Sequence, residues 1–137
     1  KELLNKIQLE DYKNSYKGFL NTEKELAKVY KESKIVLNIT MEQGVTSMNY
    51  RVLEVLASGG FLITDYKKDT ADKFKDKSDM VFYKNNLELI ALIDEYLNDN
   101  NARDIIAGNG KEKVLKYHTF KQRAENILNI LENSIFI

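Results

Sequence analysis

Residues 35–65 read IVLNITMEQGVTSMNYRVLEVLASGGFLITD, and the order of patterns within them decides the fold. Residues 35–39 are a nearly continuous β-branched run, which predicts a strand covered on both faces, as in a parallel sheet. Apolar residues then recur at helical spacing, which predicts a helix over residues 48–58. Residues 61–64 are mostly apolar and predict a second buried strand. This order predicts two parallel neighbouring strands joined by a crossover helix.

The same alternation of helices and strands continues on both sides of this unit. The sequence predicts Ser47 as the N-cap of the central helix, with Gly59 and Gly60 as its stop signals. Before this unit, the sequence predicts a strand-like segment at residues 16–20 and a helix with a capping box from Thr22 to Glu25. After it, the sequence predicts a helical turn at residues 70–74, a strand at residues 80–83 and a helix capped by Asn85 or Asn86. The remainder is expected to be a helical stretch from residue 102, with a break near Gly108 and Gly110, and a last helix capped by Thr119.

These elements predict an α/β fold, with a doubly wound parallel sheet and a helical C-terminal tail. No linker-like stretch divides the chain, so residues 1–137 are expected to form one domain. Residues 1–14 are polar and weakly patterned, and they are expected to be a frayed or truncated beginning.

The composition excludes several classes of site. The chain of 137 residues has 21 Lys and Arg against 21 Asp and Glu, so neither nucleic acid nor an anionic membrane surface is an expected partner. The absence of cysteine removes disulfides, zinc–thiolate sites and Cys nucleophiles, and the single histidine, His118, removes two-His metal sites. No apolar run approaches the roughly 20 residues of a membrane span. A cytoplasmic protein is therefore expected.

The loop after residue 39 is the best candidate for chemistry, because ligands of open parallel sheets bind beyond the carboxyl ends of the strands. Gly44 allows a ligand to approach the backbone closely. Thr46 and Ser47 place hydroxyl groups at a helix start, where free N–H groups favour a phosphate.

Two further polar residues of the central helix, Glu54 and Asn49, have two interpretations each. Arg51 and Glu54 lie on one helix face at a spacing of three, so Glu54 either binds a ligand or pairs with Arg51. Asn49 either contacts a ligand or caps the helix. Outside this helix, His118 directly precedes a predicted cap and is expected to be structural.

Residues 49–65 carry a resemblance to a known family. The pattern of Glu, two apolar residues, Ala, Ser and two Gly, followed by an apolar strand, resembles the group 1 glycosyltransferase signature of the GT-B fold, in the branch of CgeB-like spore maturation proteins. The resemblance extends from about residue 16 to residue 131. It includes a turn at residues 103–110 and a closing helical segment with His118, Thr119, Phe120 and Arg123.

The resemblance implies a Rossmann-like, C-terminal half of a GT-B enzyme that binds the sugar donor. The acceptor site would lie on an N-terminal domain of the same protein. The substrate would be a nucleoside diphosphate sugar, with a UDP-sugar favoured, and neither a tightly bound cofactor nor a metal is expected. The implied catalytic residues are Arg51 and Glu54, with Arg51 either neutralising the diphosphate or orienting Glu54. The implied donor-binding residues are Gly18 beside the base, Gly44, Thr46 and Ser47 beside the diphosphate, and Glu54 on the ribose hydroxyls. Asn49 is also expected to contact the donor.

The sequence departs from the family pattern at one position. Many group 1 members carry a second glutamate eight positions before the one matching Glu54, and that earlier residue contacts the transferred sugar; here it is Thr46. This departure leaves open a non-catalytic nucleotide-binding or interaction module of the same fold. A nucleotide-sugar epimerase is a further alternative, because such enzymes share the GT-B architecture. A flavodoxin-like receiver domain would need acidic residues at several strand ends, and Asp65 alone qualifies.

Overall fold

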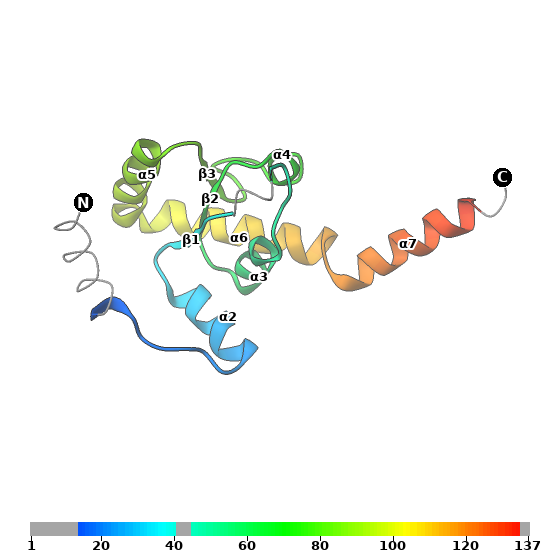
Figure 1. Ribbon diagram of the computed structural model, residues 1–137, viewed down its shortest axis with the longest axis horizontal. Coiled ribbons are helices and arrows are strands. Elements are labelled where there is room, and N and C mark those ends of the chain that lie inside the picture. Colours follow the sequence, from blue (N-terminus) through cyan, green and yellow to red (C-terminus); the bar gives the residue numbers. More distant parts are fainter. Residues whose placement is uncertain (1–13, 41–44, 135–137) are drawn as a thin grey trace.

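A computed structural model describes residues 14–40 and 45–134 of the chain (Figure 1). Its elements are, in order, α2 (Glu23–Glu32), β1 (Val36–Asn38), α3 (Tyr50–Ser58), β2 (Leu62–Asp65), α4 (Lys68–Ala71), β3 (Val81–Tyr83), α5 (Asn86–Asn98), α6 (Asn100–Tyr117) and α7 (Phe120–Ser134). The predicted alternation of strands and helices is confirmed. Of the predicted beginning at residues 1–14, all but the last residue lies outside the described residues.

The described strands form one parallel sheet in the order β1-β2-β3. Leu62 of β2 points to the face covered by α3, where it packs in a core with Leu56. Its neighbour Ile63 points to the opposite face and packs with Leu92 and Tyr96 of α5. Helices therefore cover both faces of the sheet, as predicted for an α/β fold.

Several helix ends form where local chemistry predicts them. Thr22 and Glu25 make the predicted capping box at the start of α2, because the side chain of each residue accepts a hydrogen bond from the backbone amide of the other. Gly59 ends α3 in a left-handed conformation with φ of 80°, which glycine adopts at little steric cost. Asn85 caps α5 by accepting a hydrogen bond from the Glu88 amide.

The prediction of Ser47 as the cap of α3 is wrong. The helix begins at Tyr50, and the Oδ1 atom of Asn49 accepts a hydrogen bond from the Val52 amide at 3.3 Å. The Asn49 amide group also hydrogen-bonds the side chain of Asn38 on β1, at 3.0 Å and 3.3 Å. Among the residues that the structure describes, Ser47 makes no such contact with the sheet. The hydrogen bonds between Asn49 and Asn38 therefore account for the start of α3 at Tyr50 rather than at residue 48.

Two strand predictions are also wrong. Residues 16–20 form no strand, because no neighbouring strand pairs with them in the described chain. The strand β1 is shorter than residues 35–39 and lies at an edge of the sheet. Leu37 and Ile39 are 40% and 64% exposed, so β1 is not covered on both faces.

The predicted break near Gly108 and Gly110 does not occur, because α6 continues through both residues. Gly108 has open space where a side chain would begin. At Gly110, by contrast, a Cβ atom would overlap the carbonyl oxygen of Asp79 and lie 2.8 Å from Leu56 Cδ2. Glycine at position 110 therefore serves close packing of α6 against the segment before β3.

The helix α7 extends away from the rest of the molecule (Figure 1). Thr119 and Gln122 make reciprocal hydrogen bonds at its start, as the predicted cap requires. None of the described side chains of α7 is buried, and Leu128 and Leu131 are 57% and 52% exposed. The helical C-terminal tail is thus confirmed, with an apolar side open to solvent.

Candidate functional site

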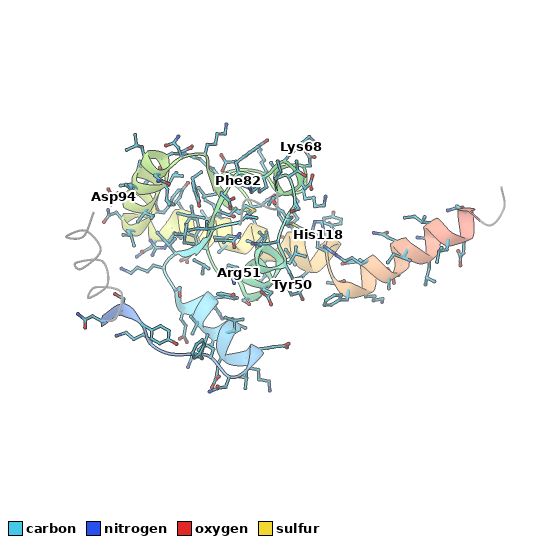
Figure 2. The ribbon with its side chains drawn as sticks, in the orientation of Figure 1. Tyr50, Arg51, Lys68, Phe82, Asp94 and His118 are labelled. Atoms are coloured by element: carbon cyan, nitrogen blue, oxygen red, sulfur yellow. The ribbon has the colours of Figure 1, made fainter. Side chains whose placement is uncertain are left out.

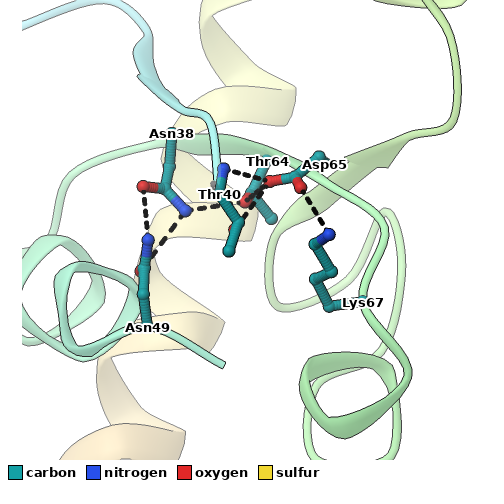
Figure 3. Close-up of polar contacts among 6 residues, drawn as sticks. All are labelled: Asn38, Thr40, Asn49, Thr64, Asp65 and Lys67. Atoms are coloured by element: carbon teal, nitrogen blue, oxygen red, sulfur yellow. Dashed lines mark hydrogen bonds and ion pairs between the residues drawn. The ribbon is translucent and has the colours of Figure 1, made fainter. Parts of the chain in front are cut away.

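A buried amide network joins the carboxyl edge of the sheet to the start of α3 (Figure 3). Asn38, which is fully buried at the end of β1, donates to Thr64 Oγ1 at 2.9 Å and exchanges hydrogen bonds with Asn49. Asn49 in turn caps α3. The network therefore fixes the helix start, with its free N–H groups, against the ends of β1 and β2.

Asp65 extends this network across the edge of the sheet (Figure 3). Its Oδ1 atom accepts hydrogen bonds from the amide and the hydroxyl of Thr40, both at 2.9 Å, and from Thr64 Oγ1 at 3.3 Å. Its Oδ2 atom lies 3.5 Å from the ammonium group of Lys67. The side chains of Lys67 and Asp65 are only 16% and 18% exposed, so this ion pair is largely shielded from solvent.

The segment before α3 is also tied to the start of α4. The Asp69 amide donates to the Thr46 carbonyl oxygen at 3.0 Å, and the Thr46 hydroxyl donates to Asp69 Oδ2 at 3.2 Å. Both loops that follow β1 and β2 therefore meet at one place. This is the edge where ligands of parallel sheets bind.

Two pockets border α3. One, of about 320 Å³, lies between α2 and α3 and is here called the α2–α3 pocket; it is lined by Glu23, Leu26, Ala27, Tyr30, Tyr50, Glu54, Ala57, Ser58 and Phe120. The other, of about 220 Å³, is here called the α3–α7 pocket; it is lined by Tyr50, Leu53, Glu54, Ala57, Val114, Leu115, His118, Thr119, Phe120 and Arg123. Glu54 and the neighbouring rings of Tyr50 and Phe120, whose centroids are 6.1 Å apart, belong to both.

Glu54 is half-buried on the wall between these pockets. In the described part of the chain its carboxylate makes no hydrogen bond or ion pair, and the expected alternative of a pair with Arg51 is not found. Arg51 is exposed on the same helix (Figure 2). Glu54 therefore offers free acceptor oxygens to a ligand in either pocket.

The other predicted site residues are spread along the same edge or lie elsewhere. Gly44 falls outside the described residues. Gly18 has a φ of 92° in the segment that leads to α2, and an added side chain there would meet open space. Thr46 and Ser47 are exposed before α3, but neither caps it. Asn49 does cap α3, which supports the capping interpretation of that residue.

His118 ends α6 and faces the aromatic ring of Phe74, with ring centroids 5.2 Å apart. Burial lowers the pKa of His118, and the positive charges of Arg123, Lys73 and Lys113 lower it further. A neutral imidazole packed on a core ring agrees with the expected structural role. The same residue nevertheless lines the α3–α7 pocket.

Close to His118, a shielded ion pair fastens α6 to the segment before β3. Asp79 is 7% exposed, and its Oδ2 atom accepts from Lys113 Nζ at 2.5 Å and from the Lys75 amide at 2.8 Å. Burial alone would raise the pKa of Asp79, but these hydrogen bonds outweigh it and hold the pKa below its usual value. The ion pair and the close contact at Gly110 both hold α6 against Asp79.

Sequence reasoning did not single out Lys67 and Asp69, which the structure places at this edge of the sheet. Their positions depend on pairing with Asp65 and Thr46, and Thr46 lies 23 residues from Asp69 along the chain. Their place just after the second predicted strand was the available signal. Among the described residues, no group of three or more His, Asp or Glu side chains is arranged to hold a metal ion. Nor does that part of the chain contain a helix long and apolar enough to cross a membrane.

Comparisons with known proteins bear on the whole arrangement. A family model described as glycosyl transferase-like matches residues 5–129. Among solved structures, the chain is similar to the C-terminal domain of a group 1 family glycosyl transferase, LpcC, from Francisella tularensis, with 21% identity and a TM-score of 0.62. The match covers 75% of this chain and 52% of that one, so the chain spans about half the length of that structure. No curated protein matches.

The likeness to the solved domain confirms the fold, with its parallel sheet and surrounding helices. The family match covers the helix α3, the pockets on both sides of Glu54 and most of α7. The chain belongs to the glycosyl transferase-like family.

Proposed function

We propose that this domain binds the nucleoside diphosphate sugar donor of a glycosyl transfer reaction, with a UDP-sugar favoured. The observation that carries the proposal is the free, half-buried carboxylate of Glu54 on the wall between two pockets. A carboxylate offers two acceptor oxygens, which suit the two neighbouring hydroxyl groups of a ribose. Burial that leaves a charged group without a partner is unfavourable unless a ligand supplies one.

The α2–α3 pocket is the proposed place of the nucleoside. It lies on the side of Glu54 toward the start of α2, and the segment with Gly18 leads into that helix. The ring of Phe19 in the same segment is 89% exposed, and an exposed aromatic ring can stack against a planar base. The base and the ribose would thus lie beside Gly18 and Glu54.

The start of α3 is the proposed place of the diphosphate. Glu54 follows Tyr50, the first helical residue, by four positions, which is about 6 Å along the helix axis. The unpaired N–H groups and the positive end of the helix dipole favour negative charge there. Arg51, Thr46 and Ser47 are exposed close to this point.

The chemistry of the domain would be electrostatic. When the sugar leaves, negative charge grows on the diphosphate, and the α3 start with Arg51 would stabilise that charge. An acceptor and any catalytic base would be supplied by a second domain of the same protein. We place the protein in the cytoplasm and in the CgeB-like branch, on the resemblance of residues 49–65 to that branch.

Isothermal titration calorimetry of the chain with UDP, GDP and ADP tests the sugar-donor site. We expect submillimolar binding of UDP, and a weakening of about tenfold or more in Glu54→Ala, since hydrogen bonds to a charged group contribute about 1.5–3 kcal/mol and 1.4 kcal/mol is a factor of ten. Glu54→Gln, which keeps an acceptor oxygen without the charge, should fall in between.

Glu112→Gln is the matched control, because Glu112 is exposed on α6 and lines neither pocket. It should bind UDP like the wild type. The proposal fails if none of the three nucleotides binds at millimolar concentration, or if Glu54→Ala leaves the UDP affinity unchanged.

A further inference from the structure

Four polar side chains gather where β2 ends: Thr46, Asp65, Lys67 and Asp69, here called the β2-edge cluster. The Asp69 amide donates to the Thr46 carbonyl oxygen, the Thr46 hydroxyl donates to the Asp69 carboxylate, and Lys67 forms an ion pair with Asp65. The cluster lies beside the start of α3, because Thr46 belongs to the segment that leads into that helix. A diphosphate at the start of α3 would therefore have this cluster among its neighbours along the chain.

The residues of the cluster differ in how many hydrogen-bond donors or acceptors remain available to a ligand. Asp65 is satisfied, because its Oδ1 atom accepts three hydrogen bonds and its Oδ2 atom faces Lys67. The ammonium group of Lys67 carries three N–H donors and makes only that one ion pair, at 3.5 Å, among the described residues. Asp69 uses one carboxylate oxygen for the Thr46 hydroxyl and has no partner for the other in the same part of the chain.

The charges of the cluster do not favour an anion. Lys67 is already opposite Asp65, and the next cation along the chain, Lys68, pairs with Asp72 at 2.7 Å. The ammonium group of Lys84 lies over the Tyr66 ring, 5.4 Å from its centre. Asp69 is therefore the one carboxylate of the cluster without an ion pair among the described residues.

A sugar hydroxyl both donates and accepts hydrogen bonds, so it suits a site with a free carboxylate oxygen beside free ammonium donors. A sugar that carries its own carboxylate would meet the charge of Asp69 at close range. We infer that Asp69 and Lys67 bind hydroxyl groups of the transferred sugar, and that this sugar is neutral. The inference rests on the proposed function, since it needs a nucleotide-sugar donor in the site.

Calorimetry with UDP, with the neutral donors UDP-glucose, UDP-galactose and UDP-N-acetylglucosamine, and with the acidic UDP-glucuronate tests the inference. The wild type should bind at least one neutral donor about tenfold more tightly than UDP-glucuronate. Asp69→Asn should reduce this ratio at least fivefold, because it removes the charge and keeps an oxygen for Thr46. Lys67→Met should weaken the neutral donor. Each affinity is divided by the affinity of the same variant for UDP, so that a change in diphosphate binding, which all these ligands share, cancels.

Asp72→Asn and Lys68→Met are the matched controls, since they change the same residue types in the exposed pair next to the cluster. They should leave all affinities unchanged. If UDP binds through Glu54 but Asp69→Asn leaves the ratio as it was, or alters UDP and the sugar nucleotides equally, the inference is wrong and the proposed function stands. If UDP does not bind the wild type, both fail.

Discussion

Replacing Gly110 by alanine should destabilise the protein, whereas the same change two residues earlier should not. Both glycines lie inside α6, and in a helix interior alanine is better than glycine by about 1 kcal/mol. At Gly108 the new methyl group meets open space, so Gly108→Ala should raise the free energy of unfolding by up to about 1 kcal/mol.

At Gly110 the methyl group would overlap the carbonyl oxygen of Asp79 and approach Leu56 Cδ2 to 2.8 Å. The first of these neighbours is backbone, held by the hydrogen bonds around Asp79, so it cannot rotate away. Forcing extra atoms into packed structure costs about 1–3 kcal/mol, and here a helix must also shift against its neighbour. We expect Gly110→Ala to lose about 2 kcal/mol after the helix gain is counted.

Urea unfolding followed by far-ultraviolet circular dichroism measures both changes, and equal slopes would show that the unfolded states are comparable. The two midpoints should move in opposite directions from the wild type. A Gly110→Ala protein as stable as Gly108→Ala would refute the close contact between α6 and the segment before β3.

Three further perturbations test other parts of the structure. Asn49→Ala removes the cap of α3 and leaves the buried Asn38 amide without one partner, so it should cost about 2–3 kcal/mol in urea unfolding, against no measurable loss for Ser47→Ala. Because the pKa of His118 is lowered in the folded protein, a falling pH protonates this imidazole in the unfolded chain first. The free energy of unfolding should therefore decrease as the pH drops below about 6.5, and His118→Gln should make it depend less on pH in that range. Lys113→Met removes the cation beside Asp79; proton titration by NMR should show the pKa of that carboxyl rising, and an unchanged pKa would contradict the ion pair.

Local sequence patterns predicted most of the helices and strands. The capping box at Thr22 and the left-handed end of α3 at Gly59 each depend on a few adjacent residues, so the sequence predicts them directly. The predictions failed where distant contacts decide. Asn49 replaces Ser47 as cap because it also bonds Asn38, and Gly110 lies inside α6 at a close contact with the Asp79 backbone rather than at a break. Neither partner is visible from local sequence patterns.

The candidate site likewise contains residues that a local motif predicts and residues that it does not. The motif around Glu54 predicted a residue that the fold places between two pockets, without an ion pair to any residue that the structure describes. Lys67 and Asp69 carry no comparable motif, because their role depends on two loops meeting at the sheet edge. The assignment of each residue to ribose, diphosphate or sugar stays a prediction until the titrations are done.

The helix α6 has a consequence for how the domain comes apart. Val114 belongs to the core on one face of the sheet, and Ile106 belongs to the core on the other. One continuous helix of 18 residues thus packs into the cores on both faces of the sheet, so we expect the two cores to unfold together. We therefore expect a single unfolding transition, in which the pockets beside Glu54, the sheet edge and the secondary structure are lost at the same midpoint.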